Sequence, residues 1–196
     1  MKQIKDLGTE LTTPANSDLI PTQQADGTTR HITRENFLQG IGGGNKIAFA
    51  QIADIKSQGT NAGVYSTANT TITRDINTVV NSATWLTLNS NIFTLTTGTY
   101  IIDALVPGYF ISQFRAWIED STTAALVLLG TAEYSTVSSV EWSRICGQII
   151  ISSEEQSFRV RFRATSSRSE TNLLGAAINI SGQSEIYTQI NIIKVA

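Results

Sequence analysis

The sequence predicts an all-β protein, an antiparallel sandwich or barrel that follows a mostly irregular arm. Beyond residue 44 it contains eight or more short segments of strand character, separated at fairly regular intervals by turn residues. No useful length of helical periodicity interrupts them. One segment, FRVRFRA at 158–164, alternates apolar and charged residues without a break. This combination is typical of antiparallel sandwiches and barrels.

The arm comprises residues 1–41 and differs in composition from the rest. It holds Pro14, Pro21 and a turn signal at Asp26-Gly27, and Thr33 is placed to cap a short helix over residues 34–38. Glycines at 42–44 predict a linker at 42–46, followed by a β-domain over 47–196. Because the arm has too few apolar residues for its own core, we expect it to be ordered against a partner.

The predicted strands follow in order along the β-domain. KIAFAQIADI opens it, a Thr-, Val- and Ile-rich segment (64–80) comes next, and residues 85–106 give three alternating runs with turns at 89–91 and 97–98. Five further segments complete the set: SQFRAWIED, AALVLLGTAEY, SVEWSRICGQIII, SFRVRFRA and SEIYTQINIIKV.

Two of these strands are apolar on both faces. Residues 100–106 place Tyr100 and Ile102 on one face and Ile101 and Leu105 on the other, and residues 186–195 behave similarly. An antiparallel sheet normally keeps its solvent face polar. A second apolar face therefore predicts a second partner, and we expect that partner to be another subunit.

Composition narrows the classes of partner. The formal net charge of −2 gives no basic footprint for nucleic acid. The longest apolar run, AALVLL, is far too short to span a bilayer, and the N-terminus lacks the apolar segment of a secretory signal. We therefore expect neither nucleic-acid binding nor membrane insertion. If the protein works outside a cell, we expect it to leave by lysis or inside a particle.

Residues 47–195 resemble the C-terminal jelly-roll domain of bacteriophage tail-fibre and virion proteins, a fold similar to tumour necrosis factor and complement-type trimeric heads. Five pieces carry the resemblance in order: DIKSQGTNAGVYST, TRDINTVV, NIFTLTTGTYIIDALVPGYF, FRAWIEDSTTAALVLLGTAEYS and EIYTQINIIKV. It implies a homotrimer of two-sheet jelly rolls, whose inner sheets contain the GTYIIDALV strand and the closing strand. The implied interface residues are Ile101, Asp103, Leu105, Arg159, Arg161, Arg163, Tyr187, Gln189 and Ile193.

The arm carries a second, shorter resemblance. ANSDLIPTQQADGTTRHITRENFL is similar to the N-terminal segment of phage tail-fibre and baseplate-associated proteins. This implies attachment to a tail or baseplate protein. The anchoring residues would be Asp18, Leu19, Ile20, Pro21, Ile32, Phe37 and Leu38.

The arginines at 159, 161 and 163 share the polar face of FRVRFRA, and three interpretations stay open. The row is solvated on an outer sheet, with its stems over apolar surface. Alternatively it lies in the inner sheet and meets carboxylates such as Asp103, Glu119 or Glu185, within or across subunits. In the third interpretation it binds an anion or an acidic sugar.

Catalytic patterns do not emerge. The single histidine, His31, lies in the arm, and no Ser-His-Asp or Cys-His set can be assembled. Metal-ligand spacing is absent, so we expect neither a metal nor a cofactor. Cys146, in a predicted strand, is interpreted as a small buried hydrophobe. We therefore expect no enzymatic activity.

Aromatic residues are the stronger candidates for contact, because exposed Trp and Tyr stack on sugars and anchor interfaces. Alternation assigns Phe93, Tyr100, Phe114, Phe158 and Phe162 to the core. The remaining candidates for contact with a host-surface glycan or protein are Tyr109, Phe110, Trp117, Tyr134 and Trp142.

These observations and the resemblance together predict a virion structural protein, a short tail fibre or fibre tip in the tail or baseplate, synthesised in the host cytoplasm. Its arm would anchor it, and its trimeric head would bind the host surface, where we expect the receptor to be a glycan. The alternative is a decoration, adaptor or assembly protein that binds another virion protein.

Overall fold

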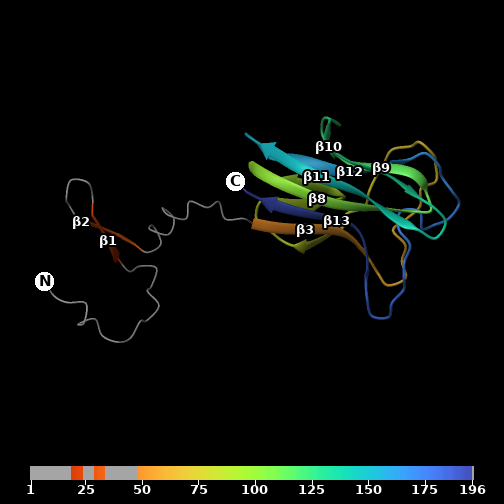
Figure 1. Cartoon of the computed structure of the whole chain (residues 1–196), viewed down its shortest axis with the longest axis horizontal. Coiled ribbons are helices and arrows are strands. Elements are labelled where there is room, and N and C mark those ends of the chain that lie inside the picture. Colours follow the sequence, from red (N-terminus) through yellow and green to blue (C-terminus); the bar gives the residue numbers. More distant parts are fainter. Residues whose placement is uncertain (1–18, 24–28, 34–47, 196) are drawn as a thin grey trace. The chain divides into compact units, whose positions relative to one another are not determined.

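The structure is a computed structural model that describes residues 19–23, 29–33 and 48–195, with the backbone alone for the first two ranges (Figure 1). The chain divides into two units, Met1–Asn45 and Lys46–Ala196. The division falls within the predicted linker at 42–46.

The described part of the arm is a two-stranded antiparallel sheet. Strand β1 (Leu19–Gln23) pairs with β2 (Thr29–Thr33), and Leu19 lies opposite Thr33. This strand pair, at 19–23 and 29–33, is an element of the arm that we did not predict. The Asp26-Gly27 turn signal, the predicted helix at 34–38, and Asp18, Phe37 and Leu38 lie outside the described residues.

The described β-domain consists of two antiparallel sheets. The five-stranded sheet has the order β11-β8-β13-β3-β5. The six-stranded sheet has the order β10-β9-β12-β7-β6, with β4 also paired to β12. Their bounds are β3 (Ala48–Lys56), β4 (Ile72–Thr73), β5 (Thr78–Asn81), β6 (Leu86–Asn89), β7 (Ile92–Leu95), β8 (Gly98–Tyr109), β9 (Ser112–Asp120), β10 (Leu126–Ser135), β11 (Val140–Ile151), β12 (Gln156–Ala164) and β13 (Glu185–Lys194).

The strand order is that of a jelly roll. The eight strands of the jelly roll are β3 and β7 to β13, and they are numbered here from first to eighth in chain order. The five-stranded sheet contains the sixth, third, eighth and first of these strands as neighbours. The six-stranded sheet contains the fifth, fourth, seventh and second. Strands that alternate between two sheets in this order form the eight-stranded double Greek key. The GTYIIDALV strand and the closing strand are neighbours in one sheet, as predicted.

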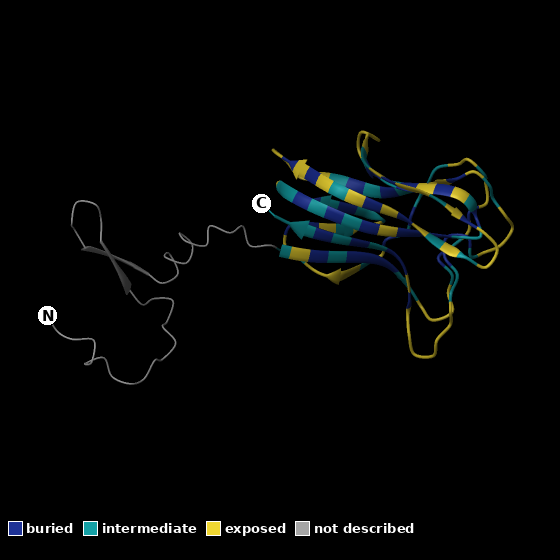
Figure 2. Cartoon of the chain, viewed as in Figure 1, coloured by how far each residue is buried: buried dark blue, intermediate teal, exposed yellow. Residues whose placement is uncertain are grey.

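The core lies between the sheets and follows the predicted alternation. Figure 2 shows buried and exposed bands alternating along the strands. Ile102 of β8 and Ile192 of β13 are fully buried, and so is Phe162 of β12. The ring of Phe162 stacks on Phe114, with centroids 5.3 Å apart, and meets Tyr65 edge-on at 5.7 Å. All five aromatic residues assigned to the core by alternation are buried: Phe93, Tyr100, Phe114, Phe158 and Phe162.

The edge strands of the two sheets, β10 and β11, meet through a buried serine. The Oγ of Ser143 donates to the Thr131 carbonyl at 2.7 Å and accepts from the Ala116 N–H at 3.0 Å. The adjacent Arg144 N–H donates to Thr131 Oγ1. Gly130 allows this approach, because a Cβ there would lie 2.7 Å from the Ala116 carbonyl oxygen. A bulge in β10 between Leu129 and Ala132 accompanies the junction.

The long loop before the closing strand is fixed by one carboxylate. Glu185 accepts backbone N–H bonds from Gly59, Asn179 and Ile178. These bonds, that from Gly59 first, lower the pKa of the Glu185 carboxyl. Gln58 also donates to Asn179, which holds two loops distant in sequence side by side.

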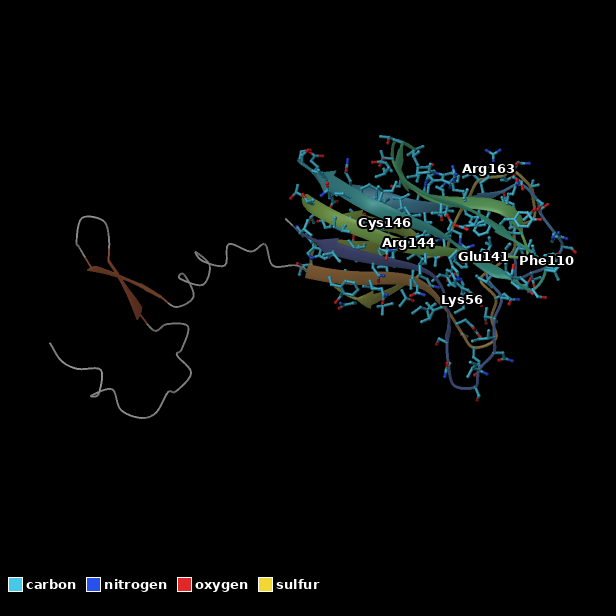
Figure 3. The ribbon with its side chains drawn as sticks, in the orientation of Figure 1. Lys56, Phe110, Glu141, Arg144, Cys146 and Arg163 are labelled. Carbon is cyan, nitrogen blue, oxygen red and sulfur yellow. The ribbon has the colours of Figure 1, made fainter. Side chains whose placement is uncertain are left out.

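The prediction that Cys146 is buried is wrong. On β11, Ser143, Ile145 and Ile149 point into the core, so the alternation turns Cys146 outward, and it is exposed. In Figure 3 Cys146 and Arg144 lie on the five-stranded sheet. The apolar neighbours of Cys146 in the sequence concealed which face it takes.

Candidate functional site

The first candidate surface is the outer face of the five-stranded sheet, here called the open face. Strand register places Ile101, Ile193 and Phe49 in one cross-strand row, and Leu105 opposite Gln189 in another. Phe49 is 44% exposed and Leu105 is 37% exposed. The open face therefore presents apolar side chains in the single chain, and it gathers five of the predicted interface residues: Ile101, Asp103, Leu105, Gln189 and Ile193.

A polar row divides the open face. Asp103 lies opposite Cys146 on one side and Asn191 on the other, and Asn191 lies opposite Gln51. Gln51 Nε2 donates to Asn191 Oδ1 at 2.9 Å, and Arg144 Nε donates to Asp103 Oδ1 at 2.7 Å. These groups are paired within the chain, so an apposed surface would meet amide and carboxylate groups in fixed positions. Such polar groups favour register more than raw affinity.

Tyr187 does not belong to the open face, contrary to its predicted place there. A bulge between Ile186 and Gln189 interrupts the alternation of β13. As a result Tyr187 is 4% exposed, and its hydroxyl donates to the Thr60 carbonyl at 2.8 Å. Burial, followed by the charge of Glu185, raises the pKa of Tyr187 to about 12.

The arginine row lies on the six-stranded sheet, so the interpretation that placed it in the sheet of the closing strand is wrong about the sheet, whereas the contact with Glu119 that it expected is confirmed. Its strand, β12, pairs with β9, β7 and β4. Arg159 Nη2 lies 2.6 Å from Glu119 Oε1, and Arg161 Nε lies 3.6 Å from the same oxygen. Arg161 Nη1 also donates to Thr73 Oγ1 at 2.6 Å. Two of the three arginines thus share one carboxylate within the chain.

The third arginine is in a different position. Arg163 lies directly opposite Arg115 of β9, and both side chains are exposed. Among the residues that the structure describes, neither takes part in an ion pair with a carboxylate. Figure 3 labels Arg163 toward the end of the β-domain at which Phe110 is also labelled.

The second candidate surface is a groove on the outer face of the six-stranded sheet, here called the Trp117 groove. It has a volume of about 990 Å³ and runs over β9, β10 and the end of β12. Ligand sites typically have volumes of about 300–1,000 Å³. Its lining includes Trp117, Leu126, Leu129, Tyr134, Arg115, Arg163, Glu133 and Glu141. Register explains the grouping, because Leu129 lies opposite Trp117 and Arg163 lies opposite Arg115.

The predicted contact aromatics are only partly brought together. Trp117 and Tyr134 line the groove, whereas the other three lie elsewhere. Trp142 of β11 lies opposite Pro107 of β8, and Trp142 is 37% exposed. Tyr109 ends β8. Phe110 follows in the turn with a φ of 47°, and the Arg168 guanidinium lies 3.9 Å from its ring centroid.

A buried charged cluster was not anticipated from the sequence. Arg74 is 1% exposed, donating from Nη2 to the Leu174 carbonyl at 2.7 Å and from Nε to Thr188 Oγ1 at 3.2 Å. Burial lowers the pKa of Arg74 to about 10, against the charge of Asp54. Burial also raises the pKa of Asp54, and the positive charge of Lys56, whose Nζ lies 3.1 Å from Asp54 Oδ1, acts against this shift. These groups are enclosed by protein, so we assign them a structural role.

The sequence missed Arg115, Leu126 and Leu129 as groove residues. SQFRAW does alternate Arg115 with Trp117, which places both on one face. Which residues lie beside Arg115 and Trp117 across the sheet, however, depends on which strands pair with β9, and the sequence alone does not give that order. Within the described ranges no three His, Cys, Asp or Glu side chains group as a metal site requires, and no helix there is long and apolar enough to cross a membrane.

No protein-family model matches the chain, and no curated protein matches it. Among solved structures, murine APRIL at pH 8.0 is 10% identical, with a TM-score of 0.47 over 76% of this chain and 99% of that one. The globular domain of zebrafish complement 1qA protein is 7% identical, with a TM-score of 0.45 over 77% and 98%. Eiger TNF from S. frugiperda is 11% identical, with a TM-score of 0.46 over 76% and 93%. The fold class rests on the strand order of the two sheets and not on these likenesses.

Proposed function

We propose that this chain is a non-enzymatic virion structural protein, a short tail fibre or fibre tip whose β-domain forms a homotrimer and recognises the host surface. The arm would attach it to a tail or baseplate protein. The open face is the observation that carries the oligomeric part of this proposal. The sequence resemblance to phage tail-fibre proteins supports the virion part.

The open face suits a subunit contact because its apolar and polar residues are arranged in rows. Ile101, Ile193 and Phe49 supply adjacent apolar area, whose removal from water is favourable by about 25 cal/mol per Å². The neighbouring row of Asp103, Asn191 and Gln51 would fix the register of the apposed copies. Three copies would present three Trp117 grooves, and weak single sites on one trimer gain affinity through multivalency.

The solution mass of the full-length chain tests the oligomeric part. We expect light scattering to give three times the chain mass of 21.2 kDa. Ile101→Asp would bury an unpaired charge in the contact, so it is expected to shift the mass toward the monomer. Val137→Asp, at a 67% exposed site outside the open face, is the matched control and should leave the mass unchanged. A monomeric parent chain would refute the trimer.

Adsorption of virus particles tests the recognition part. Purified trimer added to host cells is expected to reduce particle adsorption, because it would occupy the same receptors. The alternative role as a decoration or adaptor protein predicts a different result, in which the trimer binds to purified particles and leaves adsorption unchanged.

A further inference from the structure

Two arginines face each other in the Trp117 groove without a carboxylate between them. Arg163 and Arg115 are directly opposite residues of β12 and β9. Opposite residues on an antiparallel pair have Cβ atoms about 5 Å apart, and like charges there are destabilising. Four residues earlier on the same strand, Arg159 lies opposite Glu119 and forms an ion pair with it. The Arg115–Arg163 pair is thus an unfavourable arrangement that the described part of the chain does not compensate.

The surface beside this pair is apolar and aromatic. Trp117 lies one outward-facing position from Arg115 on β9, and Leu129 lies opposite Trp117. Tyr134 and Leu126 of β10 extend the same surface, and they are 58% and 57% exposed. A pyranose ring has an apolar C–H face that stacks on an indole or phenol ring.

Two glutamates limit how much negative charge the groove can accept. Glu133 of β10 and Glu141 of β11 are both among the residues that line the groove. A densely charged polyanion would meet these carboxylates. A ligand with few, spaced negative charges would meet Arg115 and Arg163 at one place and could donate hydroxyl protons to the glutamates elsewhere.

We propose that the Trp117 groove binds an anionic saccharide, whose sugar face lies on Trp117 and whose carboxylate is held by Arg115 and Arg163. This inference rests on the proposed recognition role and names its site and ligand class. Two guanidinium groups side by side hold a carboxylate by charge-assisted hydrogen bonds, which also relieves their mutual repulsion. The stacked ring supplies the remaining contact, and neither contact requires a conformational change of the sheet.

Calorimetric titration of the full-length protein tests this proposal at low ionic strength. The probe is trigalacturonic acid, and its fully methyl-esterified form is the matched ligand with the same sugars and no charge. We expect saturable binding of the acid and binding of the ester at least about tenfold weaker, because the charge-assisted hydrogen bonds are lost. Equal binding of acid and ester would overturn the proposal, as would no binding of the acid at about 10 mM.

Variants locate the site. Arg163→Gln and Arg115→Gln are each expected to weaken binding of the acid about fivefold or more, and Trp117→Leu to weaken both ligands. Lys194→Gln removes the same charge from the five-stranded sheet and should change binding less than about twofold. Equal effects of Lys194→Gln and Arg163→Gln would overturn the proposal in favour of unspecific charge attraction.

Two further results separate this inference from other occupants and from the proposed function. A change in solution mass with Arg115→Gln would identify the groove as a contact between copies and overturn the saccharide site. Conversely, saccharide binding by a protein that proves monomeric, or that does not compete for adsorption, would refute the proposed function and leave the groove's ligand class in place.

Discussion

Glu119 is a carboxylate shared by two arginines, and Glu119→Gln tests whether this arrangement stabilises the fold. Glutamine keeps the volume of the side chain and removes its charge. Arg159, whose Nη2 and Nε lie 2.6 and 2.7 Å from Glu119 Oε1, would lose its partner, and Arg161 would lose an attraction at 3.6 Å. The guanidinium groups of Arg159 and Arg161, two residues apart on the same face of β12, would then repel each other without a shared carboxylate.

The expected loss follows from the burial of the three groups. Breaking a fully buried ion pair costs about 3–5 kcal/mol, whereas exposed pairs are worth about 0–1 kcal/mol. Here Glu119 is 11% exposed at its side chain, Arg159 27% and Arg161 19%. The interaction lies between the two limits and nearer the buried one. We therefore expect the free energy of unfolding to fall by about 2–3 kcal/mol.

Urea denaturation at one fixed protein concentration measures this loss, because stability depends on concentration if the chain is oligomeric. The matched control is Arg163→Gln, which removes a charge from the same row without breaking an ion pair. Its effect should stay within about 0.5 kcal/mol. A loss below about 1 kcal/mol for Glu119→Gln, or an equal loss for the control, would refute the reasoning.

Three further predictions concern the buried structure. Arg74→Met removes the donor to the Leu174 carbonyl and the positive charge that compensates the buried Asp54 carboxylate. The free energy of unfolding in urea should therefore fall by about 3 kcal/mol or more, and an unchanged midpoint would contradict this. Gly130→Ala places a Cβ 2.7 Å from the Ala116 carbonyl oxygen and should lower the free energy of unfolding by about 1–3 kcal/mol in the same assay; an unchanged free energy would contradict the close approach at this junction. The pKa of Tyr187 is raised from 10.0 to about 12 in the folded state, so its contribution to stability is complete below pH 10 and is lost as the pH rises through 12. Tyr187→Phe should lack this decline in a comparison of unfolding curves at pH 9 and pH 11.5, and equal declines would contradict the assignment.

Much of the fold could be predicted because strand alternation is a local property. SQFRAWIED was predicted as a strand and is β9, Ser112–Asp120. The two faces of residues 100–106 were assigned correctly, with Tyr100 and Ile102 in the core. The predicted turn at 89–91 is confirmed, with positive φ at Ser90 and Asn91.

What could not be predicted depends on neighbours across the sheet. The position of Tyr187 required knowledge of a bulge, which shifts the alternation and leaves no clear sign in EIYTQI. The meeting of Arg163 with Arg115 required the order of β12 and β9. The sheet that contains the arginine row also followed from topology alone. The groove is composed of such non-local pairs, so its residues were identified only in part.

The junction at Ser143 bears on how this chain behaves in a crowded solution. An edge strand with free N–H and C=O groups is a template on which another chain can add a strand, and long β-proteins are prone to aggregate in this way. Here β10 and β11 are edges of different sheets, and Ser143, Thr131 and Gly130 bring them against each other. Around Thr131 and Ser143 the two edges are therefore not free to accept another strand. Loosening this junction would expose the edges of both β10 and β11 to strand addition. We therefore expect the junction to limit aggregation as well as to hold the two sheets together.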